Sequence, residues 1–551
     1  MFSYFSHWRA CRSKQQERES RIATLPAKYR AIITTRDIDI LRQPVSSIVS
    51  NVQSGLLDPQ DVLLAYGKKA LKAHEETNCL TEVMIAKAEI WAKECHKQGP
   101  LAGMPISMKD TVGVAEFDSC IGYSAWVGKP FKKDAPLVRL LRDAGAVPFV
   151  KTNVPITLLA FESCSDVFGR TTNPHSKGYS PGGSTGGEAA LLALGGSRLG
   201  IGTDVAGSVR MPAHYSGIYT IKASMSRFPK AGNASGMVGQ EGVPPVYSPM
   251  TRTLEDLETF WKAVVSMKPW EYDPSCVPIP WRDINFEKKP KWGIMWTDGV
   301  VSPSPACTRA LQQVVSTLQE HGHEVVSVNP PNPYEALTVG SQLLTNAYVA
   351  ATSPIRWWEH NDPGVYRAML ALRLPRFIQK LHVWFRRHVL RDPLYADLIE
   401  GWSVKDGQEF YALVGRREQY RMAWLNFWKE QQLDYVLTVP NALPAMKHDG
   451  GRLGWKSCGY TFLFNVLDYS AGVLPVTHVD RALDALPRDF KPTNGIEADA
   501  YEGYDAESMH GLPIGVQIVG RRLEEEKVLA GMKIIETLLK EEGKAYQRLE
   551  V

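Results

Sequence analysis

Several patterns that mark common protein classes are missing from this chain of 551 residues. No stretch of 18 apolar residues occurs, so we expect no membrane-spanning helix. Residues 1–21 are mostly polar and lack the continuous apolar region of a secretory signal peptide. Neither the phosphate-binding pattern G-x-x-x-x-G-K-[ST] nor the dinucleotide-binding pattern G-x-G-x-x-G is present. These absences favour a cytoplasmic protein that binds no nucleotide through either motif.

Cysteine patterns of metal sites and disulfide scaffolds are also missing. None of the eight cysteines forms a C-x-x-C pair, and no His/Cys cluster has the spacing of a zinc site. Eight cysteines in a chain of this length are too few for a disulfide-stapled fold. We therefore expect reduced, mostly buried thiols and no metal. The cysteines are Cys11, Cys79, Cys95, Cys120, Cys164, Cys276, Cys307 and Cys458.

An excess of charge of one sign is absent as well. The 63 basic and 59 acidic residues leave a formal net charge of +4, which is too balanced to indicate nucleic acid as a partner. Hydrophobic residues make up 44% of the chain and charged residues 22%, as in ordinary globular proteins.

Short apolar strands alternate with helical patterns along much of the sequence. Residues 58–97 carry helical periodicity, and residues 101–108 form an apolar segment that ends at Lys109. A helix at about 186–195 precedes strand character at 198–202. This alternation predicts an α/β fold whose central sheet is covered by helices on both faces.

The same survey predicts how the chain is organised. Residues 1–43 are charged and polar and indicate an exposed, partly helical arm. Residues 44–545 are expected to form a single α/β domain, with a helical insertion at about 340–433.

The sequence PGGSTGGEAALLALGGSRLGIGTDVAGSVR at 181–210 is unusually rich in glycine. It holds two serines, Ser184 and Ser208, 24 residues apart and each preceded by glycine. The backbone N–H groups of the turn Val205, Ala206, Gly207 and Ser208 could form a concave nest that stabilises an oxyanion. A purely structural turn, in which both serines cap helices, remains the alternative.

Part of this block also matches a different catalytic motif. Gly182 to Gly186 fits G-x-S-x-G, the nucleophile elbow of α/β-hydrolases, with Ser184 as the nucleophile. That motif needs a later histidine, and His510 stands in the right chain order. Nothing around His510 is distinctive, so this is the weaker interpretation.

Three motifs taken together resemble the amidase signature family. GMPISMKD, GGSTGG and GTDVAGSVRMPA follow one another in the family's order, and the 24-residue serine spacing fits. The similarity runs from about residue 45 to 545 and includes YTFLFNVLDYSAGVLPV and LPIGVQIVGRRLEEEKVL. It is greatest to the acetamidase and fatty acid amide hydrolase branch. The resemblance implies a mixed central sheet and hydrolysis of a carboxylic amide without metal or organic cofactor.

The resemblance also implies a Ser–Ser–Lys triad. Ser208 would be the nucleophile, Ser184 would bridge it to Lys109, and the Gly183–Ser184 peptide bond would be cis. Lys109 would act as the base, so it must be neutral in the resting site. Without the two serines, a solvated Lys–Asp pair would be the better interpretation of Lys109.

Two residues depart from the family's pattern and two others match supporting positions. Thr185 stands where serine is usual and keeps a hydroxyl. Ala206 stands where close relatives often have glycine, which would strain the turn if a positive φ were required there. Asp204 and Arg210 match positions that brace the oxyanion turn.

The substrate is less well defined by the sequence. Leu158, Leu159 and Phe161 lie where the family lines its acyl channel, although they could simply be core residues. Residues 373–391, RLPRFIQKLHVWFRRHVLR, form a basic amphipathic stripe that suits an anionic membrane surface. Such a stripe can equally pack on the protein's own core, in which case a small or aryl acetamide is as plausible a substrate as a fatty acyl amide.

Two further expectations concern partners. We call the helical insertion that carries the stripe at 373–391 the cap. If the apolar side chains of the cap are exposed, a homodimer that shields part of them is favoured. A non-catalytic binding or scaffold subunit is the alternative of another class, which the presence of Lys109, Ser184 and Ser208 disfavours.

Overall fold

A mixed sheet of eleven strands forms the centre of the computed structural model, which describes residues 2–356, 358–451 and 455–550. The strand order is β1-β3-β2-β6-β8-β7-β12-β13-β11-β9-β10, and β4 and β5 form a separate small ribbon. The strands are β1 (Leu80–Val83), β2 (Pro105–Lys109), β3 (Val147–Thr152), β4 (Cys164–Ser165), β5 (Gly169–Arg170), β6 (Leu199–Asp204), β7 (Tyr219–Lys222), β8 (Val246–Thr251), β9 (Lys291–Ile294), β10 (Glu324–Ser327), β11 (Tyr435–Thr438), β12 (Ala471–His478) and β13 (Pro513–Val519).

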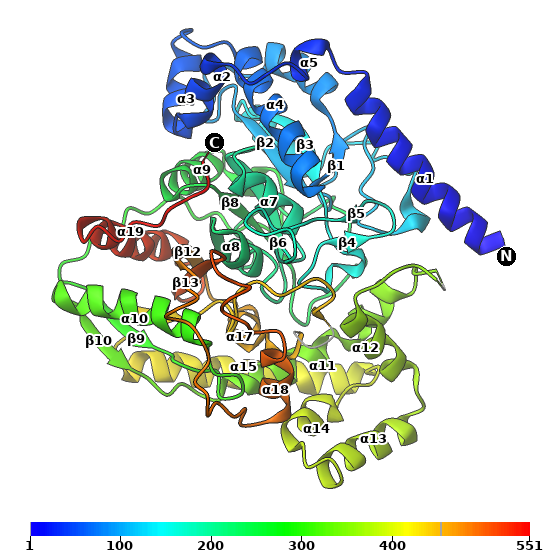
Figure 1. Cartoon of the computed structure of the whole chain (residues 1–551), viewed down its shortest axis with the longest axis vertical. Helices are drawn as coiled ribbons and strands as arrows, with labels where there is room; N and C mark the ends of the chain where they lie inside the picture. The colour runs from blue at the N-terminus through cyan, green and yellow to red at the C-terminus, as the bar shows by residue number, and fades with distance from the viewer. Residues whose placement is uncertain (1, 357, 452–454, 551) are drawn as a thin grey trace.

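Helices flank this sheet on both faces, as the alternation of patterns predicts (Figure 1). The helices are α1 (Phe2–Ala23), α2 (Thr35–Arg42), α3 (Val45–Gln53), α4 (Pro59–Thr77), α5 (Ile85–Glu94), α6 (Pro136–Asp143), α7 (Gly186–Ala193), α8 (Arg210–Ser216), α9 (Leu254–Ser266), α10 (Pro305–Glu320), α11 (Pro333–Thr352), α12 (Pro363–Arg373), α13 (Arg376–His388), α14 (Pro393–Glu400), α15 (Gly407–Glu430), α17 (Gly459–Val466), α18 (Gly495–Tyr501) and α19 (Glu525–Glu541).

The position of β2 in the sheet determines where the site forms. β2 lies between β3 and β6 and runs parallel to both, with Met108 opposite Ile201 on β6. The carboxyl ends of parallel strands meet at one edge of a sheet. Lys109, the last residue of β2, therefore lies beside the end of β6 and the turn that follows it.

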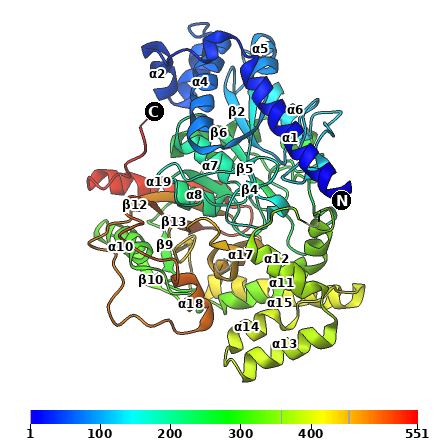
Figure 2. The same ribbon diagram turned by 45° about the vertical axis from the view of Figure 1, so that its right-hand side comes forward.

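Helices α11 to α14 gather at one end of the molecule, away from α1 to α5 (Figures 1 and 2). This group and α15 account for the helical insertion expected at about 340–433, although the first helix already begins at Pro333. In the part of the chain that the structure describes, no helix is long and apolar enough to cross a membrane.

The structure corrects two of the sequence predictions. Residues 58–97 are not one helix, because the buried strand β1 separates α4 from α5 and pairs with β3. The segment 1–43 is not exposed throughout: Lys14 of α1 is buried and forms ion pairs with Glu82 and, at 3.0 Å, with Asp118. A charged residue can be buried when opposite charges surround it, and composition alone does not reveal such partners.

β7 and β8 are among the strands that were not predicted from the sequence. β7 and β8 lie at the ends of a Pro- and Gly-rich stretch between Ala223 and Thr251, which obscured their strand character. They pair with each other and connect the two halves of the sheet through β6 and β12.

Candidate active site

Lys109 is fully buried at the end of β2 and is surrounded by hydroxyl groups. Its Nζ lies 2.7 Å from Ser184 Oγ, 2.9 Å from Thr185 Oγ1 and 2.6 Å from Thr203 Oγ1. Burial lowers the pKa of Lys109 to about 7, although the carboxylates of Asp204 and Glu188 oppose this shift. A neutral amine is therefore available at Lys109 near neutral pH, in direct contact with the Ser184 hydroxyl.

Ser184 follows a backbone segment that only glycine can form. The Gly183–Ser184 peptide bond is cis, as expected from the resemblance. A Cβ atom on Gly183 would lie 2.2 Å from the carbonyl oxygen of Ala160, so a larger residue would collide with backbone there. This close approach holds Ser184 in front of Lys109, just before the first turn of α7.

Ser208 lies in the turn between β6 and α8. Its side chain and that of Ser184 line one cavity, together with Thr203. No hydrogen bond joins the two serine hydroxyls among the contacts of the described residues. Catalytic hydrogen bonds are often long in a free enzyme and tighten when substrate binds, so this geometry is compatible with a relay.

A buried ion pair braces the turn that carries Ser208. The Asp204 carboxylate accepts hydrogen bonds from the backbone N–H groups of Gly207 (2.8 Å) and Val209 (3.2 Å). The Arg210 guanidinium contacts both oxygens of Asp204, at 2.9 and 3.1 Å, and both side chains are fully buried. Burial alone would raise the pKa of Asp204, but the Arg210 charge overrides it and holds that pKa well below its usual range.

The four predicted N–H donors of this turn divide into two groups. The Gly207 N–H is bonded to Asp204, so it is not available to a substrate and its assignment to the oxyanion nest is wrong in this conformation. The N–H groups of Val205, Ala206 and Ser208 donate to no protein acceptor among the described residues. These three also line the cavities next to Ser208, where a substrate carbonyl would lie.

Ala206 does not strain the turn. The residue with positive φ is Gly207, at 120°, and Ala206 is not among the residues of positive φ. A Cβ on Gly207 would meet Thr461 Oγ1 at 2.5 Å. Glycine is therefore required one position after Ala206, and alanine is tolerated at 206.

Two buried residues of the site were missed in the sequence. Thr203 contacts Lys109 directly, and the signal for it was its place on β6 just before Asp204. Glu188 of α7 is fully buried, accepts a hydrogen bond from Thr152 Oγ1 at 2.7 Å and contacts Ser107 Oγ closely. Burial raises the pKa of Glu188 to about 8, although those two hydroxyls and Lys109 oppose the shift. Glu188 is therefore largely protonated at neutral pH, which limits its opposition to a neutral Lys109.

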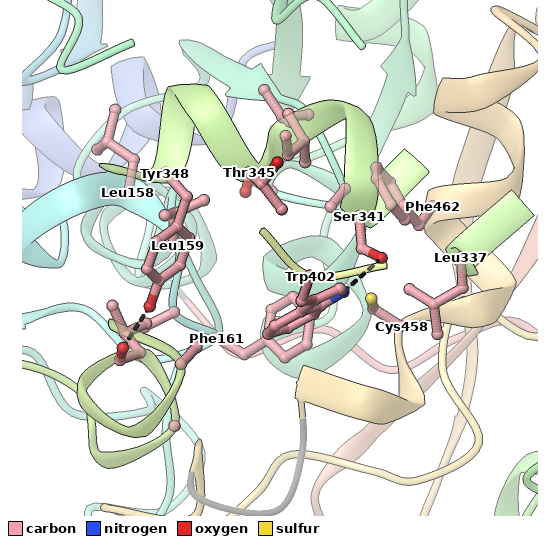
Figure 3. Close-up of a pocket in the computed structure, with 18 of the residues that line it drawn as sticks. Leu158, Leu159, Phe161, Leu337, Ser341, Thr345, Tyr348, Trp402, Cys458 and Phe462 are labelled. Atoms are coloured by element: carbon pink, nitrogen blue, oxygen red, sulfur yellow. Dashed lines mark hydrogen bonds between the residues drawn. The ribbon is translucent and has the colours of Figure 1, made fainter. Parts of the chain in front are cut away.

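An apolar cavity opens at Ser208. None of its lining residues is charged. Figure 3 shows Leu158, Leu159 and Phe161 on one side of it and Leu337 and Phe462 on the other. All three residues predicted to line an acyl channel thus lie on the wall of this cavity. The remaining lining residues are Ala160, Val205, Ala206, Ser341, Leu344, Thr345, Tyr348, Gly364, Val365, Ala368, Leu372, Trp402 and Cys458.

The nucleophile-elbow interpretation is not supported. His510 Nδ1 accepts a hydrogen bond from the backbone N–H of Arg481, and His510 lines neither cavity beside Ser208. The base that reaches Ser184 is Lys109. Among the described residues, no group of three or more His, Cys, Asp or Glu side chains is arranged to hold a metal ion.

Comparison with known proteins identifies the class to which this arrangement belongs. The sequence profile of the Amidase family matches residues 61–529, which is most of the chain, so the protein belongs to the amidase family. It is a hydrolase that acts on amide carbon–nitrogen bonds, and its substrate is an amide.

Individual relatives cover nearly the whole chain. An acetamidase of Aspergillus oryzae is 34% identical over 95% of this chain and 94% of its own length. The fatty-acid amide hydrolase 1 of Sus scrofa is 32% identical over 96% of this chain and 92% of its own. A solved fatty acid amide hydrolase structure superposes with a TM-score of 0.80, covering 92% of this chain and 86% of that one, at 28% identity.

Proposed function

We propose that this amidase hydrolyses amides of hydrophobic carboxylic acids through an acyl-enzyme on Ser208. Neutral Lys109 takes a proton from Ser184, which in turn takes the proton of Ser208, and Ser208 Oγ attacks the amide carbonyl carbon. The proton then returns through Ser184 to the leaving nitrogen as the carbon–nitrogen bond breaks. Water attacks the acyl-enzyme by the same route and releases the acid.

The turn after β6 would stabilise the intermediate. The N–H groups of Val205, Ala206 and Ser208 have no protein acceptor among the described residues and line the cavity at Ser208. Donors fixed in place before the reaction stabilise a developing oxyanion without reorganisation. Asp204 and Arg210 support this geometry by holding the backbone of residues 207 and 209.

The observation that carries the acyl preference is the cavity that opens at Ser208, whose lining residues are uncharged and mostly apolar. Burial of apolar surface contributes roughly 0.8 kcal/mol per methylene group, so each added carbon that fits should strengthen binding. The second candidate is a small-amide acetamidase, which is favoured by the similarity to the Aspergillus oryzae acetamidase.

The chain is proposed to be cytoplasmic and to reach membranes through α13. Apolar side chains on and after this helix are exposed, among them Phe377 at 72%, Leu381 at 61% and Trp384 at 54%. The stripe therefore does not pack on the protein's own core, and a basic apolar face of this kind suits an anionic lipid surface. A homodimer that shields part of the same face stays a prediction.

Neighbouring acids reduce the positive charge of this surface. Arg376 pairs with Glu409, Arg386 with Asp392, and Arg387 with Asp397 and Glu400. Arg373, Lys380 and Arg391 have no such partner among the described residues. The cap is accordingly less basic than residues 373–391 suggest on their own.

The decisive experiment measures kcat/KM for primary amides from acetamide to oleamide, with and without anionic liposomes. The proposal expects kcat/KM to rise with chain length and to rise further with liposomes. A maximum at two to four carbons that liposomes do not change would overturn it in favour of the small-amide enzyme. A fluorophosphonate probe tests catalysis itself: labelling that Ser208→Ala abolishes supports an enzyme, and an unlabelled wild type supports a binding subunit.

A further inference from the structure

Two cavities of different chemistry meet at Ser208. The apolar cavity described above contains no charged lining residue, whereas a second cavity is lined by a lysine and by no acid. The two share only Leu158, Val205 and Ser208. The second cavity is lined in addition by Thr111, Ser184, Thr203, Lys230, Asn233, Ala234, Ser235, Met237, Pro245 and Tyr247.

The position of Ser208 between the cavities separates the two halves of an amide. If the acyl group occupies the apolar cavity, as the proposed function requires, the nitrogen and its substituent point into the second cavity. Ser184, which would return the proton to the leaving nitrogen, lines only this second cavity. The second cavity is therefore the place of the leaving amine.

The charged residue of the leaving-amine cavity is Lys230, which is half-buried and lacks a counterion. Its ammonium group makes no hydrogen bond or ion pair within the described part of the chain. Asp273 lies close to this segment, but its carboxylate accepts hydrogen bonds from the backbone N–H groups of Lys230 and Ala231, at 2.7 and 2.8 Å, and from Ser275. The Lys230 charge thus remains available to a ligand.

The other polar lining residues of the cavity are uncharged, and two of them are already bonded to the protein. Asn233 donates to the carbonyl of Lys230 and accepts from the N–H of Gly113, and Ser235 Oγ accepts from the N–H of Met237. The unpaired charge of a residue that lines a partly enclosed cavity attracts an anion more strongly than it would in open water. Lys230 is therefore the group that distinguishes substrates on this side of the scissile bond.

We propose that the leaving amine carries a carboxylate, so that the substrates include N-acyl amino acids, with Lys230 as the residue that selects them. This inference rests on the proposed function for the placement of the acyl group. It goes beyond it by assigning the chemical class of the amine. A neutral amine gains nothing from Lys230, and a cationic amine is repelled by it.

The test compares N-lauroylglycine with N-(2-hydroxyethyl)lauramide, which has the same acyl group and a neutral substituent. The readout is the ratio of their kcat/KM values, from release of lauric acid. Lys230→Met should lower this ratio about tenfold, which corresponds to about 1.4 kcal/mol of lost charge interaction. Lys230→Arg should restore most of the ratio, and Lys230→Glu should favour N-(2-aminoethyl)lauramide. Lys93→Met, an exposed lysine on α5 that lines neither cavity, is the matched control.

Added salt provides a measurement that needs no variant. The ratio in the wild type should fall as ionic strength rises, because a half-exposed charge is screened. An equal loss of activity on both substrates in Lys230→Met, or a ratio that salt and Lys230→Met leave unchanged, overturns the assignment. Hydrolysis of primary amides alone would also overturn it.

The design separates this inference from the proposed function. The same pair is measured with acetyl in place of lauroyl, so that a wrong acyl length does not decide the result. Loss of hydrolysis in Ser208→Ala together with an unchanged ratio in Lys230→Met refutes the amine assignment alone. Full activity in Ser208→Ala refutes the catalytic proposal, whatever the ratio shows.

Discussion

The glycine-rich centre and the helical cap of this amidase differ in how their charged side chains are buried and paired. Around Lys109 the charged groups are fully buried, and each is held by hydroxyls or by an opposite charge. On α13 the apolar stripe is exposed and the cations are at least partly exposed, and the acids that pair with Arg387 come from the neighbouring α14. Burial shifts pKa values and makes contacts strong in the centre, whereas solvent weakens the same contacts in the cap.

The largest expected loss of activity follows from removal of the nucleophile. Ser208→Ala should lower kcat/KM about 10³-fold or more, because no other group can form the acyl-enzyme. The measurement is amide hydrolysis by the purified variant. Ser197→Ala is the control, since that buried hydroxyl donates to the carbonyl of Leu199 and lines neither cavity beside Ser208. Full activity in Ser208→Ala would contradict the mechanism.

The second prediction compares how much one ion pair from each region contributes to the free energy of unfolding. Arg210→Met leaves the fully buried Asp204 without its cation, and we expect the free energy of unfolding to fall by about 3–5 kcal/mol. Arg387→Met in the cap should change it little, since that pair is exposed. Chemical denaturation of both variants checks the contrast. Equal losses would show that the two regions do not differ in this way.

The third prediction concerns pH. The base form of Lys109 is the neutral amine, and burial lowers its pKa to about 7, so kcat/KM should fall as the pH decreases through about 7. Lys109→Ala should lower activity most near neutral pH, where the wild-type amine is neutral and a substitute base is scarce. A pH profile of kcat/KM for a neutral amide tests both statements. A wild-type profile without this ionisation would argue against Lys109 as the base.

Glu188→Gln should shift the pH profile of kcat/KM by a smaller amount. The ionised fraction of Glu188 favours protonated Lys109, so a neutral side chain of the same shape should move the acidic limb of the profile to lower pH. Glu258→Gln on α9, whose carboxylate pairs with two lysines at the surface, serves as the control. Movement of the limb to higher pH would contradict the electrostatic role given to Glu188.

The smallest effect is expected at the cap. The double change Phe377→Ser and Trp384→Ser should weaken binding to anionic vesicles about tenfold, because apolar area available to the lipid is lost. Vesicle co-sedimentation measures this directly. Tyr411→Ser on α15, a residue that is 76% exposed, is the matched control. Unchanged vesicle binding in the double variant would remove α13 from the proposed membrane surface.

Local sequence patterns predicted the elements that position the site. The strand ending at Lys109, the helix after Ser184 and the strand before Asp204 were all expected close to where they occur. The catalytic roles of Lys109, Ser184 and Ser208 came from the family resemblance and remain predictions to be tested by substitution.

Contacts between distant segments were harder to predict. Nothing in the local pattern of α1 indicates that Lys14 lies between Glu82 and Asp118, which are 68 and 104 residues away. The bond between Gly207 N–H and Asp204 is local, but it depends on the backbone geometry of the turn after β6 and was also missed; it removes one of the four expected oxyanion donors.

The amino-acid sequence by itself determined the glycine positions, the order of strands and helices near the site, and the amphipathic stripe at 373–391, because these depend on local backbone freedom and periodicity. Only the tertiary structure decided that Lys109 is buried among three hydroxyls and that Glu188 is close enough to affect its pKa. It also decided that the apolar stripe is exposed to solvent. The physical reason is that burial and charge pairing arise between residues far apart in the chain. Those contacts set the pKa of Lys109, and among the described residues they leave Lys230 without an ion-pair partner in the cavity that Ser208 also lines.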